Sequence, residues 1–343
     1  MLVLNWRDPA PGEAMRRREF ITLLSGSAFT WPRAARAQQR AIPRIGYIWS
    51  GAPGAEMSIA GLRRGLTDRG YVVGRNLMIE ERYAEGNPER VPALIAESLG
   101  LNIDVLVTPG TTITRAAQRA TTTVPIVCIT GNPVGSGLVA SLSRPGGNIT
   151  GMSLLSGEYS AKWLELLTKA APTLHRIAVL WNPDNPAMIE EHNHLEDTAR
   201  VLGLALTFLS ARPSEIEASL AALTPATVDG FVVTDDAFLE PLLPRLIALA
   251  ADRRLPALYP FSNAIQQGGL MSYSANFFAM WRRAAGYVDR ILKGDRPSDL
   301  PIEQATEVAL NINLKTAKAL GLTIPTTLLV TADGVIASLD CGA

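Results

Sequence analysis

Short polar side chains follow the ends of several β-branched stretches in this sequence, where they could hydrogen-bond a small molecule. One group opens a helical pattern directly after the apolar run 103–107 and comprises Thr108, Gly110, Thr111 and Thr112. A helix start leaves main-chain N–H groups without partners, and these attract a carboxylate. Glycine before the helix lets a ligand approach the backbone. The threonines could equally cap the helix, and capping is compatible with binding.

A second group in the other half of the chain could bind a positively charged or hydroxyl group. Asp235 and Asp236 follow the run 228–234, and either carboxylate could receive a ligand ammonium. Both could instead be helix N-caps. Asn182 and Asn185 follow a further β-branched run, although their Asn-Pro-Asp-Asn-Pro segment is also typical of a simple turn.

The remaining candidates extend these two groups at other strand ends. In the first half they are Ser50, Gly51, Gly131 and Asn132, and in the second half Tyr259, Phe261, Ser272 and Tyr273. Tyr259 and Phe261 could also be core aromatics. The whole set is polar, short-chained and partly aromatic, which suits a small polar molecule with an apolar part.

Residue patterns for catalysis, metal binding and nucleic-acid binding are missing. No G-x-G-x-x-G follows the first predicted strand, and the chain has no P-loop and no G-x-S-x-G elbow. His192 and His194 are two residues apart on a predicted helix, so they point apart and cannot share a metal. Lysine plus arginine equals aspartate plus glutamate, 32 each, which gives no basic surplus for phosphates. We expect no enzyme, no cofactor and no nucleic-acid partner.

A repeated pattern predicts the elements that position these residues. Residues 44–50 (RIGYIWS) return as 176–182 (RIAVLWN), 103–108 return as 228–234, and 124–128 return more loosely as 255–259. Short β-branched runs alternate with amphipathic helical stretches throughout, which favours parallel α/β sheets. The sequence therefore predicts two doubly wound Rossmann-like lobes. In such sheets ligands bind beyond the carboxyl ends of the strands, where the candidates lie.

The connecting segments predict a hinge between the lobes. Residues 130–160 are rich in glycine and suit a crossover. A helix follows Ser274 and ends at Lys293-Gly294. Its helical spacing predicts one buried face formed by Phe277, Trp281, Ala284, Val288 and Ile291. The segment 306–313 suits a hinge strand. We assign 38–150 plus about 275–310 to the first lobe and 151–274 plus about 311–343 to the second. The lobes are expected to close on the ligand about segments near residues 150, 275 and 310.

The N-terminus has the pattern of an export signal. Arg16, Arg17 and Arg18 precede a short apolar run, and the small-x-small site 35–37 follows it. The run is too short to span a bilayer. Residues 17–21 (RREFI) resemble the twin-arginine motif, and Met15 could be the true start. A basic amphipathic arm is the alternative. We expect signal cleavage near residue 37 and a periplasmic mature chain without membrane insertion.

Several long phrases resemble one family, the tryptophan/tyrosine-type ABC transporter substrate-binding proteins, whose fold is the type I periplasmic-binding fold. The phrases cover nearly the whole mature chain: IPRIGYIWSG (42–51), GLTDRGYVVGRNLMIEERYAEGNPER (65–90), GNPVGSGLVASLSRPGGNITG (131–151), AVLWNPDNP (178–186), LPALYPF (255–261), GGLMSY (268–273) and NLKTAKALGLTIP (313–325). Asn132 departs from the usual Gly-Asp-Pro-Val phrase, and the tail after Asp333 differs from the usual ending.

The resemblance implies the substrate-binding component of an ABC importer, which delivers a small organic solute to a membrane permease. It suggests an amino acid as the ligand. A sensor module on the same scaffold is an alternative that the sequence does not separate from transport. A two-lobe α/β enzyme is a further alternative, but this chain lacks the catalytic and nucleotide-binding motifs named above. A sugar-binding gene regulator would carry a helix-turn-helix where this chain has the export signal.

Overall fold

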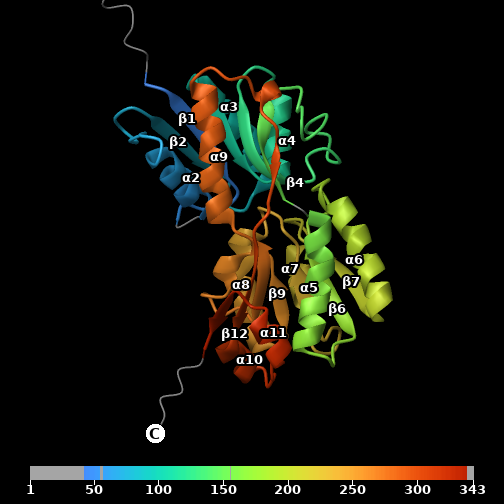
Figure 1. Ribbon diagram of the computed structural model, residues 1–343. Helices are drawn as coiled ribbons and strands as arrows, with labels where there is room; N and C mark the ends of the chain where they lie inside the picture. Colours follow the sequence, from blue (N-terminus) through green and yellow to red (C-terminus); the bar gives the residue numbers. More distant parts are fainter. Residues whose placement is uncertain (1–41, 55–56, 155, 338–343) are drawn as a thin grey trace, which may run out of the picture. The chain divides into compact units, whose positions relative to one another are not determined.

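The computed structural model describes residues 42–54, 57–154 and 156–337, which form two β-sheets with helices on both faces of each (Figure 1). The predicted export signal lies outside the described residues. The first sheet contains β1 (Arg44–Trp49), β2 (Met78–Tyr83), β3 (Val105–Pro109), β4 (Ile126–Gly131), β5 (Ile149–Leu154) and β11 (Glu303–Gln304). Their spatial order is β11-β5-β4-β3-β1-β2, and all the pairs are parallel.

The second sheet repeats this arrangement. It contains β6 (Arg176–Trp181), β7 (Ala205–Ser210), β8 (Gly230–Val233), β9 (Ala257–Tyr259), β10 (Met271–Ala275), β12 (Val308–Asn313) and β13 (Gly334–Ile336). The order is β13-β12-β10-β9-β8-β6-β7, and only the β10–β12 pair is antiparallel among the described strands. The order β2-β1-β3-β4-β5 thus recurs as β7-β6-β8-β9-β10. Each is a doubly wound sheet, so the predicted fold class is confirmed.

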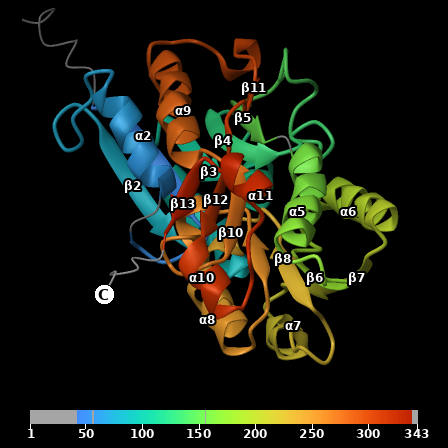
Figure 2. The same cartoon turned by 60° about the horizontal axis from the view of Figure 1, so that its bottom comes forward.

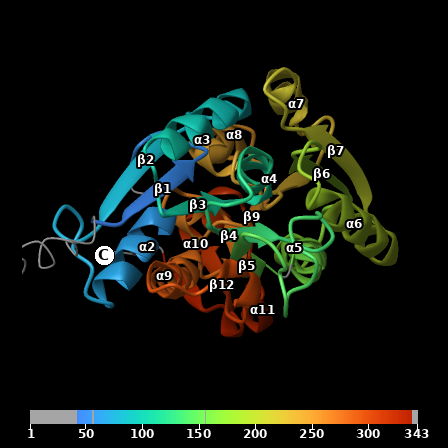
Figure 3. The same ribbon diagram turned by 90° about the horizontal axis from the view of Figure 1, so that it is seen from above.

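The helices of the first lobe cover both faces of its sheet, as Figure 3 shows. One pair packs on one face and the other pair on the opposite face: α2 (Met57–Thr67) with α9 (Phe277–Leu292), and α3 (Val91–Gly100) with α4 (Thr111–Ala120). The buried stripe of α9 includes Trp281, Ala284 and Val288, as its spacing predicts, and the helix is followed by Gly294 at φ +110°.

The second lobe has the same layered arrangement. Its helices are α5 (Ser156–Ala170), α6 (Met188–Leu202), α7 (Ile216–Ala222), α8 (Leu243–Asp252), α10 (Leu314–Ala319) and α11 (Thr326–Val330). The last two lie beside β12 and β13 at the C-terminal end of the described chain (Figure 2). Short 3-10 turns are η1 (Pro88–Arg90), η2 (Glu240–Leu242), η3 (Ser262–Ala264) and η4 (Pro297–Asp299). No described helix is long and apolar enough to cross a bilayer.

Apolar runs form central strands such as β1 and β6 because helices cover both faces of each sheet. In β6, Ile177 and Val179 pack on the α5 and α6 side, whereas Ala178 and Leu180 pack on the α7 and α8 side. Successive side chains of a strand point to opposite faces, so a strand between two helical layers must be apolar at every position. Residues that follow the carboxyl ends of the parallel strands therefore lie together at one edge of each sheet, beyond the two helical layers.

The first lobe extends past the crossover predicted near residue 150. Residues 149–154 form β5, which pairs with β4, so residues 151–154 belong to the first sheet rather than the second. Gly151 conceals this strand in the sequence because it interrupts the apolar run. It has a φ of +138°, and an added Cβ would overlap the Cys128 carbonyl, so no other residue fits there. The described chain passes between the sheets after β5, after β10 and between β11 and β12.

Candidate functional site

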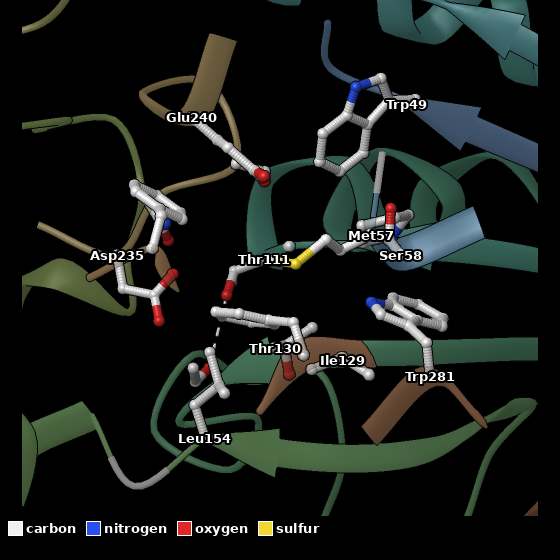
Figure 4. Close-up of a pocket in the computed structure, with 17 residues that line it drawn as sticks. Trp49, Met57, Ser58, Thr111, Ile129, Thr130, Leu154, Asp235, Glu240 and Trp281 are labelled. Atoms are coloured by element: carbon white, nitrogen blue, oxygen red, sulfur yellow. Dashed lines mark hydrogen bonds between the residues drawn. The ribbon is translucent and has the colours of Figure 1, made fainter. Parts of the chain in front are cut away.

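A pocket of about 560 Å³ lies where the carboxyl ends of strands from both sheets meet (Figure 4). This volume includes space that is open to solvent. The first sheet and its α4 contribute Trp49, Pro109, Gly110, Thr111, Ile129, Thr130, Gly131 and Leu154. The second lobe contributes Asn185, Asp235, Ala237, Glu240 and Phe261, and the starts of α2 and α9 add Met57, Ser58, Phe277 and Trp281.

The sequence-predicted residues divide into three sets by location. Those that line the pocket are Gly110, Thr111, Gly131, Asn185, Asp235 and Phe261. Those that adjoin it without lining it are Ser50, Gly51, Thr108, Thr112, Asn132, Asn182 and Asp236. Those within the second sheet are Tyr259, Ser272 and Tyr273.

Two of the adjoining residues, Asn182 and Asp236, hold the pocket loops in place together with Asn185. Asn182 and Asn185 both donate their side-chain amide hydrogens to Asp236 Oδ2, at 3.2 and 2.7 Å. Asp236 Oδ1 accepts the Phe238 N–H at 2.8 Å. The Asn-Pro-Asp-Asn-Pro segment is therefore a turn whose asparagines also anchor the Asp236 loop. Only Asn185 of the pair reaches the pocket.

Buried hydroxyls of the first lobe make contacts of their own. Ser50 donates its hydroxyl to the Ala237 carbonyl of the second lobe. The Thr108 hydroxyl lies 2.9 Å from that of Thr114. The Thr112 hydroxyl is buried and has no hydrogen-bond partner among the described residues. None of the three faces the pocket.

Tyr259, Ser272 and Tyr273 were predicted to bind the ligand, but the structure places them elsewhere. Tyr259 is fully buried and meets Phe231 edge-on, with ring centroids 6.1 Å apart, so the core interpretation holds. The Ser272 hydroxyl accepts from Asn311 at 3.3 Å. The Tyr273 ring meets Tyr159 edge-on on the α5 side. The side chains of Tyr259 and Tyr273 pack against the helical layers that cover the second sheet. Phe261, two residues past β9, lines the pocket.

The start of α4 presents main-chain donors to the pocket. Gly110 is its N-cap at φ +85°, and no side chain caps the helix. The predicted alternative, capping by a threonine, does not occur, because the Thr111 hydroxyl donates to the Gly131 carbonyl at 3.4 Å. The first turn of N–H groups lacks intrahelical acceptors. Together with the helix dipole, these groups favour an anion here.

Asp235 supplies a carboxylate to the pocket from the second lobe. Burial raises its pKa well above the usual value, and the charges of Glu240 and Asp236 add to the shift. Its carboxylate accepts no hydrogen bond from the described residues, so it does not act as the N-cap that was the alternative. Glu191 of α6 lies near both aspartates, and burial likewise raises its pKa. A positive ligand group would relieve this concentration of acidic side chains.

Several pocket residues were not found by sequence reasoning. Trp281 and Phe277 were predicted only as parts of the buried stripe of α9, yet at the start of that helix the stripe borders the pocket. Figure 4 shows the indole nitrogen of Trp281 facing the pocket. Trp49 directly precedes the predicted residue Ser50 at the end of β1. Because successive side chains of a strand point to opposite faces, this alternation was the signal that could have identified Trp49. No spacing pattern indicated that Glu240 would line a pocket.

No group of three or more His, Cys, Asp or Glu side chains in the described ranges is arranged to hold a metal ion. His192 stacks on Phe208, with ring centroids 3.7 Å apart. Cys128 is a buried residue of β4, and burial raises the pKa of its thiol to about 12, so it is a small apolar core residue.

Asn132 links the two lobes beside the pocket. It donates its side-chain amide to Glu190 of α6, accepts the Gly135 N–H at 2.8 Å, and has a φ of +28°. Asn and Asp tolerate such a backbone better than other side chains. An aspartate here would place a second carboxylate against Glu190.

We therefore expect Asn132→Asp to lower the melting temperature by a degree or two at low ionic strength, because surface like-charge pairs cost only about 0.5 kcal/mol. Added salt should remove the difference, since it screens exposed charges. Glu190→Gln in the same chain should remove it as well. Thermal unfolding at two salt concentrations measures the effect, and a deficit that persists in high salt would show that charge is not its cause.

Known proteins resemble this chain over most of its length. The family described as "ABC transporter substrate binding protein" matches residues 50–336. A tyrosine-binding protein of Clostridioides difficile is 24% identical over 275 residues, which are 79% of this chain and 78% of the relative.

Solved structures are also similar. A conserved domain protein from Vibrio cholerae has 27% identity and a TM-score of 0.79, covering 86% of this chain and 100% of its own. An ABC domain in complex with L-Trp from Streptococcus pneumonia has 23% identity and the same TM-score and coverage. The family match spans both lobes and every strand that contributes to the pocket except β1, which ends at Trp49. The chain belongs to the family of ABC transporter substrate-binding proteins.

Proposed function

We propose that this protein captures an amino acid with an aromatic side chain and delivers it to the permease of an ABC importer. The observation that carries this proposal is that one pocket has a group that favours an anion on one side and a carboxylate on the other. The uncapped start of α4 favours a carboxylate on the first-lobe side, and Asp235 offers a partner for an ammonium on the second-lobe side. An α-amino acid carries both groups on one carbon.

The remaining wall of the pocket suits an aromatic side chain. Trp49, Phe261, Phe277 and Trp281 border it, and Phe261 and Phe277 face each other with ring centroids 6.5 Å apart and planes 27° apart. Aromatic rings supply a large apolar contact area and prefer such offset arrangements. The names of two relatives, a tyrosine-binding protein and an L-Trp complex, support the same ligand class.

Family membership and the sequence support a location outside the cytoplasm and a movement of the lobes on binding. Substrate-binding proteins of importers act outside the cytoplasm, and the predicted signal of residues 1–37 supports export to the periplasm by the twin-arginine route. Fractionation of cells that express an Arg17→Lys, Arg18→Lys variant tests this route. The described crossings between the sheets support closure of the lobes about a hinge.

We expect L-tryptophan, L-tyrosine or L-phenylalanine to raise the melting temperature of the purified protein, because a ligand that binds only the folded state stabilises it. At 100 times the dissociation constant the gain is about 2.7 kcal/mol. A thermal-shift panel should include L-leucine, L-alanine, sugars and organic acids as comparison ligands. Stabilisation by a sugar or organic acid, with none by an aromatic amino acid, would refute the proposal.

A further inference from the structure

The pocket has more negative charge than one α-ammonium can neutralise. Its lining includes two carboxylates, Asp235 and Glu240, and none of the described residues that line it is a lysine, arginine or histidine. The carboxylate of an amino acid would be met by the start of α4, and its ammonium by Asp235. Glu240 then remains without a role in binding the main-chain groups of the ligand.

Glu240 occupies a different part of the pocket from Asp235. Figure 4 shows its carboxylate entering the pocket between Asp235 and Trp49. It begins η2, and its Oε1 atom accepts the side-chain amide of Asn263 at 3.3 Å. Asn263 belongs to η3, which directly follows Phe261. Glu240 is therefore oriented by the same segment that supplies part of the aromatic wall.

The carboxylate of Glu240 can accept a further hydrogen bond. An ionised carboxylate has about four lone-pair positions, so Glu240 can accept a hydrogen bond from a ligand in addition to the contact with Asn263 and its other interactions within the protein. The side chain is half-buried, so a bound ligand that covers it must replace the water it loses. A bare aromatic ring offers no donor and would leave this charge poorly solvated.

We propose that Glu240 is a specificity-determining residue, whose carboxylate accepts a hydrogen bond from a donor on the aromatic ring of the ligand. This inference rests on the proposed function and deepens it. Ring donors of this kind are a phenol O–H and an indole N–H. The protein then discriminates against L-phenylalanine, which has the same ring wall to fill but no donor to offer.

The structural alternative is that Glu240 only stabilises η2 through its place in the first turn. An acidic residue there interacts favourably with the helix dipole, but η2 has three residues and its N-cap, Leu239, makes no side-chain cap. A second alternative is that Glu240 binds the α-ammonium in place of Asp235. In that case its loss would weaken all amino acids equally.

The test is calorimetry of wild type and Glu240→Gln with L-tyrosine, L-tryptophan and L-phenylalanine. Wild type should bind one or both donor-bearing ligands about 10- to 100-fold more tightly than L-phenylalanine, as expected for a hydrogen bond to a charged group. Glu240→Gln should reduce that preference to a few-fold by weakening the donor-bearing ligands while L-phenylalanine binds as well as before. Glu217→Gln removes an exposed acid of the same lobe that pairs with Arg245 and should change nothing.

Two results would overturn the inference: a wild type that binds L-phenylalanine as tightly as both other ligands, or a Glu240→Gln effect equal for all three. Tyramine and phenethylamine, which lack the carboxylate, separate this failure from failure of the proposed function. One outcome would be that no amino acid binds, but tyramine binds more tightly than phenethylamine in wild type and equally tightly in Glu240→Gln. In that case the proposed function is wrong and the role of Glu240 stands. If none of the five ligands binds, both are wrong.

Discussion

Asp235→Asn should weaken binding of the aromatic amino acid by roughly 30-fold or more. Loss of one partner of a desolvated charge pair typically costs about 2–5 kcal/mol, and Asp235 is the carboxylate nearest the end of β8 in the pocket lining. Asparagine has nearly the same shape, so the pocket geometry is retained. The amide presents its own N–H donors to the ligand ammonium, which adds to the loss.

The same substitution should leave the empty protein as stable as before or make it more stable. Burial and the charges of Glu240 and Asp236 raise the pKa of Asp235 in the folded state. Because the carboxyl pKa is higher in the folded state, the folded protein binds the proton more tightly than the unfolded chain does. Protonation of Asp235 therefore stabilises the fold at low pH, and this stabilisation is lost as the pH rises through the folded-state pKa. Any gain in melting temperature from Asp235→Asn should therefore appear at neutral pH and vanish near the unfolded pKa of 3.8.

Ligand binding should also show a pH dependence that the variant lacks. A ligand ammonium favours the ionised form of Asp235, so binding releases a proton at a pH where Asp235 is protonated in the ligand-free protein. The affinity of wild type should therefore fall as the pH drops through the raised pKa of Asp235. Calorimetry in buffers of different ionisation enthalpy measures the proton release. Asp184→Asn, an exposed acid in the neighbouring loop that pairs with Arg212, is the control. Unchanged affinity in Asp235→Asn would remove Asp235 as the ammonium partner.

Gly110→Ala should lower both stability and affinity, for two separable reasons. The φ of +85° at this position is unfavourable for alanine and costs about 1 kcal/mol or more. In addition, an added Cβ would lie 2.8 Å from the Ala237 Cβ of the other lobe. One lobe must then move away from the other, next to the α4 start that meets the ligand carboxylate. We expect at least a tenfold loss of affinity.

Gly74→Ala isolates the backbone contribution. Gly74 has the same φ of +85°, but an added Cβ there would meet nothing within 4 Å. Both variants should lose a similar amount of stability by thermal unfolding, whereas calorimetry should show lost affinity for Gly110→Ala alone. Wild-type affinity in Gly110→Ala would mean that the close approach of Gly110 to Ala237 does not matter for binding.

The doubled architecture could be predicted because it depends on local pattern. A strand covered on both faces must be apolar throughout, so β1 and β6 stand out in the sequence, and their similarity revealed the repeat. The stripe of α9 was equally visible, since its buried side chains recur at helical spacing. The strand β5 was hidden, because its close packing on β4 requires Gly151.

For the pocket, the sequence by itself located the edge of the sheets where it lies and six of the residues that line it, but not the others. Gly110, Thr111 and Asp235 line the pocket because residues just past parallel strands must lie at that edge. Whether a side chain there faces the cleft, a helical layer or a neighbouring loop depends on a rotation of the chain that composition does not encode. Tyr259 therefore lies in the core, and the Asp236 carboxylate accepts hydrogen bonds from Asn182 and Asn185. Trp281 and Glu240 come from segments distant in sequence, and only the packing of α9 and η2 against the strand ends brings them into one pocket.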